Sequence, residues 1–251
     1  MTRLLFIPLL LLLAAGFLEA PAHQDTWSPA SWQHPLGTDE FGRDLLRVLL
    51  ISTGRSTLFG ALLSAMAVTL ATLTAAATTL QAFPPVAAAI RLVTQAVESV
   101  PIFLWVLAAF ASYRTHSTTI IPIAFLLAVL PISTHVLRGE FERLSREPYM
   151  DAAKLSGVSL LRLFTAYYLP NAQAVLVPLG VQLFGIAISI RGAVGVLGFS
   201  TRADCDLGIL LLRGKENVGE HPLLLVTTVV ALVAVYGGLE GVRRGFVGRG
   251  G

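Results

Sequence analysis

The residue types that usually carry bond-making chemistry are present in this sequence, but they are not grouped for it. The histidines are scattered, at His23, His34, His116, His135 and His221. No His-Glu-x-x-His or Gly-x-Ser-x-Gly run occurs, and Gly214-Lys215 is followed by Glu216, which breaks the phosphate-binding loop pattern. The single cysteine, Cys205, has no Cys or His at metal-ligand spacing. The sequence therefore predicts no enzyme, no metal site and no cofactor held by this chain.

A polar segment near the middle of the chain has the pattern of two short helices joined by a turn. Pro148 suits a first helical turn, and Asp151 favours the positive N-terminal end of that helix. The residues 152–155 are strong helix formers, and Gly157 can adopt the left-handed conformation that ends a helix. Pro170 is expected to close the second helix because proline cannot extend an interior turn. The pattern predicts a compact helix–turn–helix, rigid enough to transmit a push.

This segment resembles the coupling loop of permease subunits in bacterial ATP-driven importers. The family pattern is Glu-Ala-Ala, three residues, Gly, nine residues, Ile, one residue and Leu-Pro. The matching residues, with Glu147 just before them, are Asp151, Ala152, Ala153, Gly157, Tyr167, Leu169 and Pro170. Asp151 keeps the charge of the family's Glu, whereas Tyr167 replaces Ile by a bulky side chain with a hydroxyl. The resemblance implies that the helix pair docks into a cleft of a separate ATPase subunit, which binds ATP and Mg.

A second resemblance lies in residues 34–44, which read His-Pro-Leu-Gly-Thr-Asp-Glu-Phe-Gly-Arg-Asp and are followed by the Gly-Arg-Ser-Thr-Leu run at 54–58. This stretch is similar to the segment before the second span in the C-type permease of dipeptide, oligopeptide and nickel importers. The residues singled out are Gly37, Thr38, Asp39, Gly42, Arg43 and Asp44. The glycines allow tight turns, and the charged side chains can pair or cap a helix starting near Phe41. We favour a role in folding this loop over direct contact with substrate.

Two ionisable residues are candidates for the permeation path. Glu98 lies inside an apolar run, where an ionisable side chain by default faces an interior or water. Its alternative role is to reach the membrane surface or to bond backbone groups freed by Pro101. Arg191 precedes a glycine-rich stretch, 194–222, that resembles the region between the last two spans of the same family. Arg191 stands where that family usually carries Glu, and Leu207 stands where it usually carries Trp.

The composition predicts that these candidates are positioned by helices in a membrane. The chain of 251 residues is 55% hydrophobic and 13% charged, against roughly 25% charged in soluble domains. Its basic residues are spread between apolar runs, so the net charge of +3 does not indicate nucleic-acid binding. An all-α membrane protein with about six spans is predicted. The expected spans are Leu4–Leu18, Leu58–Phe83, Leu92–Tyr113, Ile120–Leu137, Ala172–Ile190 and Leu223–Leu239.

The expected organisation follows the apolar runs. Residues 1–18 are either a short transmembrane helix or a cleavable signal-like segment, since the run is short enough for both. Residues 19–56 are expected to form an external loop with an amphipathic piece, 57–246 the transmembrane domain with its coupling loop at 138–171, and 247–251 a cytoplasmic tail. Arginines after the fourth and sixth spans place both segments in the cytoplasm, although basic residues before the sixth span count against this orientation.

The resemblance, which extends from about residue 34 to 246, implies a type I ABC (ATP-binding cassette) importer permease fold. It implies a subunit in the bacterial inner membrane that imports peptides, nickel or nickel chelates. The partners implied are a second, B-type permease, two ATPase subunits or domains, an extracytoplasmic solute-binding protein and membrane lipid, with no nucleic acid. A secondary transporter or channel is the alternative, but it would usually carry several intramembrane carboxylates. A membrane-embedded enzyme or assembly factor would need a catalytic constellation.

Overall fold

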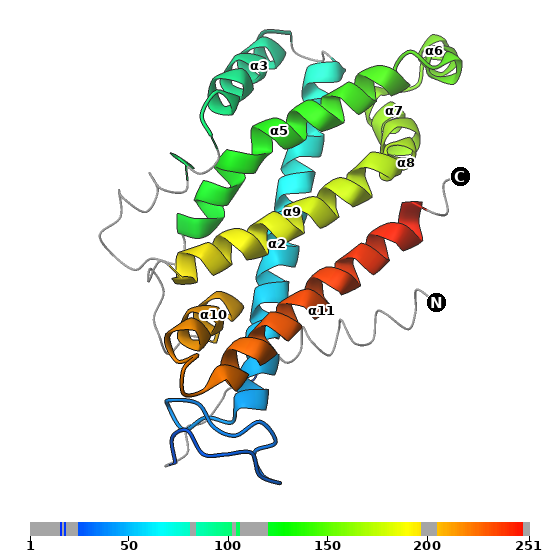
Figure 1. Ribbon diagram of the computed structural model, residues 1–251. Helices are drawn as coiled ribbons and strands as arrows, with labels where there is room; N and C mark the ends of the chain where they lie inside the picture. The colour runs from blue at the N-terminus through cyan, green and yellow to red at the C-terminus, as the bar shows by residue number, and fades with distance from the viewer. Residues whose placement is uncertain are drawn as a thin grey trace. The chain divides into compact units, whose positions relative to one another are not determined.

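The computed structural model describes residues 16, 18, 25–80, 84–101, 104–105, 120–196 and 205–247. The helices are α2 (Leu45–Thr79), α3 (Pro84–Glu98), α5 (Ile120–Leu144), α6 (Pro148–Leu155), α7 (Leu160–Leu163), the π-helix η1 (Phe164–Tyr168), α8 (Leu169–Asn171), α9 (Gln173–Val196), α10 (Leu207–Glu216) and α11 (Pro222–Val247) (Figure 1). Within the described residues, the only β feature is an isolated bridge between Thr38 and Asp44. The predicted all-α class is confirmed.

Four helices in the described part of the chain are long and apolar enough to cross a membrane. They cover Leu45–Thr79, Pro122–Leu144, Gln173–Ala193 and Pro222–Gly241. These helices coincide with the second, fourth, fifth and sixth spans expected from the sequence. The first expected span, apart from residues 16 and 18, and most of the third lie outside the described residues. The total of six spans therefore stays a prediction.

Helix α2 begins at Leu45, before the expected start of the span at Leu58, so the segment 19–56 is helical from residue 45 onward. Asp44 starts the helix, because its Oδ1 accepts a hydrogen bond from the Arg47 amide at 2.8 Å. The hydroxyl groups that interrupt the apolar run are accommodated inside the helix. Thr53, for example, donates from Oγ1 to the Leu49 carbonyl at 2.7 Å.

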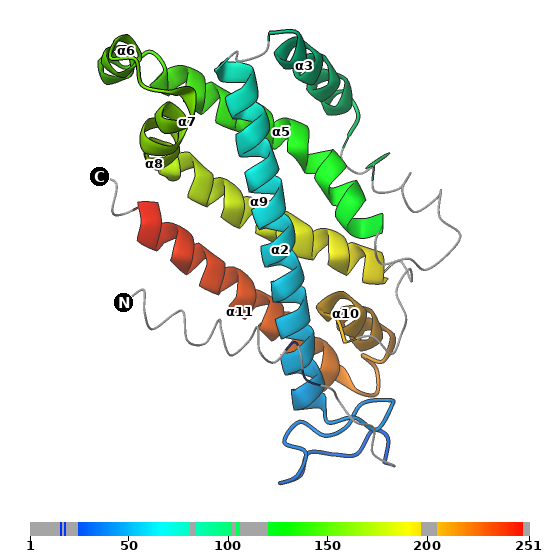
Figure 2. The same ribbon diagram turned by 180° about the vertical axis from the view of Figure 1, so that it is seen from behind.

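Helix α3 replaces the beginning of the expected third span. Pro84 and Pro85 lie in its first turn. Prolines are tolerated there because the backbone N–H groups of a first turn have no hydrogen-bond partner within the helix. Arg91 lies within it and donates from Nη2 to the Thr78 carbonyl near the end of α2, at 3.0 Å. Both views show α3 beside α5 (Figures 1 and 2). The helix ends at Glu98, shortly before Pro101.

The chain divides into two compact units. The first unit comprises residues 1–62 and 184–245, and the second comprises residues 63–183 and 246–251. Helices α2 and α9 each run from one unit into the other. In the first unit, Leu45, Val48 and Ile51 form one face of α2, because residues three apart share a side of a helix. They pack in one cluster with three further buried residues, Cys205, Leu210 and Leu224.

The core of the second unit contains many small side chains. Ala67, Ala71 and Ala75 repeat every four residues along α2 and are fully buried. Small residues let membrane helices approach closely, and the hydroxyls of Thr74 and Thr134 are hydrogen-bonded at 2.8 Å between α2 and α5. This packing holds α5, whose end carries the segment of the predicted coupling loop.

Candidate functional site

The first half of the segment 147–171, called the helix-pair segment below, was predicted correctly from local signals. Glu147 occupies the position before the helix in an extended conformation, and Pro148 takes the first helical position of α6. Asp151 lies in the first turn, where the carboxylate favours the helix dipole. Gly157 follows the helix with a φ of +71°, the left-handed conformation expected for it.

The second half differs from the prediction, because Pro170 does not close a helix. The short helix α7 continues through the π-helix η1 into α8, and Pro170 lies in the first turn of α8, immediately before α9. A proline is tolerated there because the first turn of a helical segment needs no donor from its backbone nitrogen. Tyr167 lies in η1, and its carbonyl accepts a hydrogen bond from the Asn171 side chain at 2.6 Å.

An aromatic cluster fixes the helix-pair segment to the end of α5. Phe141 of α5 is buried and meets the rings of Phe164 and Tyr168 edge-on, at centroid distances of 6.1 and 5.4 Å. Burial raises the pKa of the Tyr168 hydroxyl, an effect that a hydrogen bond with Ser145 partly opposes. The Tyr168 ring therefore joins this aromatic cluster in its neutral form.

The two alanines of the matched pattern have different roles. Ala153 is buried together with Met150, so this side of α6 packs inward, whereas Ala152 is exposed. Asp151 is also exposed, and its carboxylate is 3.4 Å from the Lys154 ammonium. Only one alanine of the pair is therefore available to an outside surface.

Exposed leucines lie in the same segment as Ala152 and were missed at the sequence level. Leu155 is 90% exposed and Leu161 74% exposed, and Leu160 and Leu169 are exposed to a smaller extent. Such a group of exposed apolar side chains on an anchored element is typical of a protein interaction site. A sequence signal existed, because these leucines interrupt polar residues on helices too short to bury two faces. The segment thus presents exposed apolar side chains next to the ends of α5 and α9.

The loop before α2 contains a buried ion-pair cluster. Asp39 is fully buried, and its Oδ2 accepts hydrogen bonds from Arg43 Nε and from Arg213 Nη2 of α10, each at 2.9 Å. Arg213 is also fully buried and donates from Nε to Glu40 at 2.8 Å. Both guanidinium groups lie within 5.0 Å of the Phe41 ring centroid. Burial raises the pKa of Asp39, but hydrogen bonds from Arg43 and Arg213 outweigh it, so the net shift is downward.

The remaining residues singled out in this loop form its turns. Gly37 and Gly42 have φ angles of +78° and +69°, and a Cβ on Gly37 would lie 2.4 Å from the Ser28 carbonyl oxygen. Thr38 accepts from the Ser28 amide and donates to the Asp25 carbonyl, each at 2.8 Å. These contacts favour a role in folding the loop. Arg213 is one of the basic residues before the sixth expected span, and its contact with this loop was not predicted from the sequence.

Glu98 and Arg191 lie in different units. Glu98 is the exposed last residue of α3, which is not among the helices of membrane-spanning length in the described part of the chain. Arg191 is half-buried near the end of α9, where it pairs with Asp206 and stacks over the Phe59 ring at 4.3 Å from its centroid. The structure therefore gives Arg191, but not Glu98, a defined polar environment.

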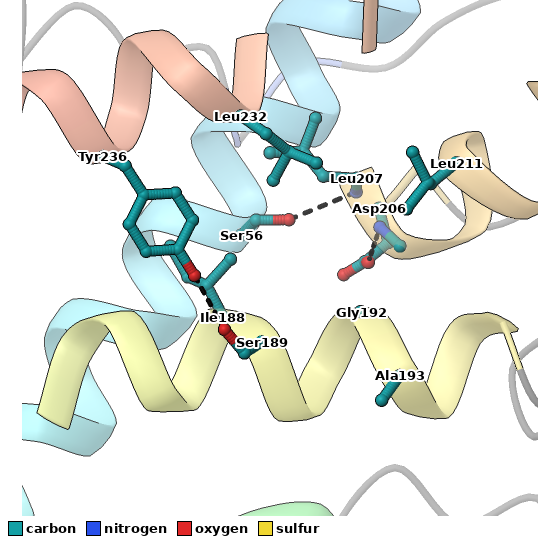
Figure 3. A pocket seen from close by; sticks show the side chains of 11 residues that line it. Ser56, Ile188, Ser189, Gly192, Ala193, Asp206, Leu207, Leu211, Leu232 and Tyr236 are labelled. Atoms are coloured by element: carbon teal, nitrogen blue, oxygen red, sulfur yellow. Dashed lines mark hydrogen bonds between the residues drawn. The ribbon is translucent and has the colours of Figure 1, made fainter. Parts of the chain in front are cut away.

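Next to this ion pair, the first unit contains a cavity of about 410 Å³ between α2, α9, α10 and α11 (Figure 3). The Ser189 and Tyr236 hydroxyls lie 2.8 Å apart at one side, and the Tyr236 hydroxyl also donates to the Gly185 carbonyl at 2.9 Å. At the other side, the Ser56 hydroxyl accepts from the Leu207 amide at 3.3 Å. The cavity combines hydrocarbon walls with a few hydroxyls and the Asp206 side chain.

The cavity depends on a close contact between α9 and α10 at Gly192 and Gly208. A Cβ at Gly208 would lie 2.5 Å from the Gly192 Cα and 2.9 Å from its carbonyl oxygen, so a side chain there must displace backbone. We expect Gly208→Ala to lower the free energy of unfolding by about 1–3 kcal/mol, the usual cost of overpacking. Gly192→Ala is the matched control, because its Cβ would have no atom nearer than 3.9 Å. The stability of both variants is measured by thermal unfolding in detergent. Equal unfolding temperatures of the two variants would contradict the predicted close contact between Gly192 and Gly208.

Comparison with known proteins gives sequence relatives. No protein-family model matches the chain. A Brucella suis protein named as a peptide transport system permease is 29% identical over 192 residues, 76% of this chain and 64% of the relative. A Brucella abortus protein of the same description matches with the same figures. This chain thus spans less than two thirds of the length of these proteins.

A further relative is the oligopeptide transport system permease protein OppC of Mycobacterium bovis. It is 27% identical over 224 residues, which are 85% of this chain and 74% of the relative. The named relatives agree with one another in describing peptide transport permeases. A permease is a membrane protein, which is consistent with the four helices of membrane-spanning length in the described part of this chain. Together these observations indicate a multi-pass membrane protein.

Proposed function

We propose that this chain, which is similar to named permeases of peptide transport systems, forms half of the translocation path of an ATP-driven (ABC) peptide importer. The other half would be a second, B-type permease. An extracytoplasmic binding protein would deliver the peptide, and two ATPase subunits or domains would bind ATP and Mg. The complex would lie in the bacterial inner membrane, with the helix-pair segment on the cytoplasmic side. Nickel or a nickel chelate is the alternative cargo, but the named relatives favour peptide.

The observation that carries this proposal is the exposed apolar face of the anchored helix-pair segment. Leu155 and Leu161 offer an apolar surface to an ATPase cleft, while Asp151 supplies a charge at its edge. On the inner side, Met150 and the Phe141–Tyr168 contact fix the segment to the protein. A partner that moves this segment therefore moves α5, and through the continuous η1–α8–α9 junction it also moves α9.

A secondary transporter or channel working alone fits less well. Proton-coupled transporters usually place carboxylates inside the membrane. In the described part of the four apolar helices, the acidic residues are Glu140, Glu142 and Glu240, near the C-terminal ends of α5 and α11. Each accepts a hydrogen bond from an arginine on the same helix. These carboxylates are thus engaged at helix ends and are poorly placed for carrying protons.

Co-purification tests the coupling directly. The chain would be co-expressed with the second permease and the ATPases encoded beside it and purified through a tag on this chain. We expect Leu155→Glu combined with Leu161→Glu to abolish retention of the ATPases, because two charges would enter an apolar interface. Both side chains are largely exposed, so the fold should survive the change.

The control for this experiment is Val218→Glu, at a 47% exposed side chain between α10 and α11. It adds one charge of the same sign outside the helix-pair segment and should leave retention unchanged. If the wild-type chain retains no ATPase, the importer function is wrong. If the double variant retains as much ATPase as the wild type, the helix-pair segment is not the docking site.

A further inference from the structure

The cavity between α2, α9, α10 and α11, called the Tyr236 cavity below, has a buried floor and a rim at the protein surface. Its floor consists of Ser56, Ile188 and Leu207, which are all buried. Ser189 and Tyr236 are exposed and form part of the rim. The volume of about 410 Å³ lies within the range of about 300–1,000 Å³ typical of small-ligand sites. The Tyr236 cavity can therefore hold part of a small organic molecule that enters from outside.

The polar groups on the wall of the Tyr236 cavity are engaged within the protein. One Asp206 carboxylate oxygen accepts from the Gly208 amide at 2.8 Å, and the other pairs with Arg191. The Ser189 and Tyr236 hydroxyls are hydrogen-bonded to one another, and the third hydroxyl on the wall accepts from a backbone amide of α10. A charged ligand would have to break such contacts, and an ordered water would need about two to four polar partners. The wall therefore favours an uncharged, apolar ligand.

The helices around the Tyr236 cavity place its rim on an apolar surface. The membrane-length stretches Gln173–Ala193 and Pro222–Gly241 contain the wall residues that α9 and α11 contribute. On α11, Val229, Val233 and Tyr236 are exposed, and their spacing puts them on one side of the helix. The rim thus continues an exposed apolar face of a helix long enough to cross a membrane. In a bilayer, the medium around such a face is lipid acyl chain.

We propose that the Tyr236 cavity binds the acyl chain of a membrane lipid, which enters past Tyr236 from the apolar face of α11. This inference goes beyond the proposed function and does not rest on it, because it needs only that the chain lies in a bilayer. The chain gains van der Waals contacts with Ile188, Leu207 and Leu211 (Figure 3), which would lack partner atoms beside an empty cavity. The described residues that line the cavity include no arginine or lysine, so the lipid headgroup is not selected.

Photo-crosslinking from within the bilayer tests this proposal. The full chain, purified with the subunits that it retains, is reconstituted in vesicles of phosphatidylethanolamine and phosphatidylglycerol. A small share of one of the two lipids carries a diazirine near the end of an acyl chain, and mass spectrometry identifies the labelled residues after irradiation. We expect label on the buried floor as well as on Val226, an exposed residue of α11. The labelling of the floor should be the same whichever lipid carries the diazirine.

Filling the Tyr236 cavity should abolish the label on its floor. Leu232→Trp fills it from α11 and should leave the labelling of Val226 unchanged. Leu211→Trp fills it from α10 and replaces the first variant if that one does not fold. Val230→Trp is the matched control, because Val230 is 62% exposed and lies on nearly the opposite side of α11 from Leu232. It should keep the label on the floor.

The wild-type protein alone can overturn the proposal. If Val226 is labelled but the floor is not, no acyl chain enters the Tyr236 cavity. Labelling of the floor by only one of the two lipids would show that the headgroup is recognised, which contradicts a site for the acyl chain alone. Floor labelling that persists in both filled variants would place the reacting chain elsewhere. None of these results depends on peptide import, so the proposed function and this inference can fail separately.

Discussion

Replacing Arg213 by methionine is expected to lower the free energy of unfolding by about 3 kcal/mol, far more than a typical surface substitution. Arg213 and Asp39 are both fully buried, and the guanidinium also holds Glu40. Methionine keeps much of the volume but leaves Asp39 with Arg43 as its ion-pair partner. The loss is at the lower end of the range for broken buried pairs because Arg43 remains. The loss of stability is measured by thermal unfolding in detergent, with size-exclusion chromatography to detect the folded protein that remains.

Two control variants show whether the loss of stability comes from this buried ion-pair cluster or from the removal of any arginine. Arg143→Met removes an arginine whose side chain is 58% exposed and pairs with Glu140 and Glu147, and such solvent-screened surface pairs contribute little to stability. The double variant Arg213→Met with Asp39→Asn should be less stable than Arg213→Met alone, because it also removes the carboxylate that pairs with the buried Arg43. A change of less than about 0.5 kcal/mol for Arg213→Met alone would show that the cluster is not stabilising.

The pH dependence of the free energy of unfolding is a second measurement that reports on the same ion-pair cluster. The pKa of Asp39 is lowered from its ordinary value of 3.8, so its ionised form is favoured by folding. This contribution is fully present above pH 3.8 and is lost as the pH falls through the lower folded-state pKa. Wild-type stability should therefore decline below about pH 4, and Arg213→Met should show a weaker decline because one hydrogen bond to the carboxylate is gone.

Local signals could be read from the sequence, whereas partners distant in the chain could not. Pro148 and Gly157 act through their own backbone preferences, so the bounds of α6 follow from a few adjacent residues. The Asp39–Arg213 contact joins residues 174 positions apart, and no local pattern identifies such a pair. Asp39 was recognised as a pairing residue, but its second partner became visible only when α10 was placed against the loop.

The start of α2 and the role of Pro170 were both predicted incorrectly from the sequence. The apolar run of α2 is interrupted by hydroxyl residues, but a threonine such as Thr53 can satisfy its hydroxyl on its own helix, so α2 extends back to Leu45. Pro170 was expected to end a helix, but the π-helix before it ends at Tyr168 and places the proline in a first turn. A single extra residue in a helical turn leaves no clear mark in composition.

The Phe141 junction gives the second large prediction, which rests on the proposed function. Phe141→Ala should lower the amount of peptide imported per ATP hydrolysed by tenfold or more, because the helix-pair segment would then move without α5. The ring is 1% exposed and contacts both Phe164 and Tyr168, and deleting a buried phenylalanine side chain costs about 3–5 kcal/mol. Each 1.4 kcal/mol is about a tenfold change in an equilibrium, so detached states of the segment become far more populated.

The measurement is the ratio of imported peptide to released phosphate in vesicles that contain the complete importer. Phe125→Ala is the matched control, because Phe125 is fully buried on the same helix, α5, but lies more than four turns away from Phe141 along the sequence. It should lower stability to a similar extent while keeping the peptide-to-phosphate ratio. Equal uncoupling in both variants would mean that general loosening of α5, and not the aromatic junction, limits transport. A ratio lowered only by Phe141→Ala would place the transmission of movement at the contact between α5 and η1, since the remainder of α5 would be equally weakened in both proteins.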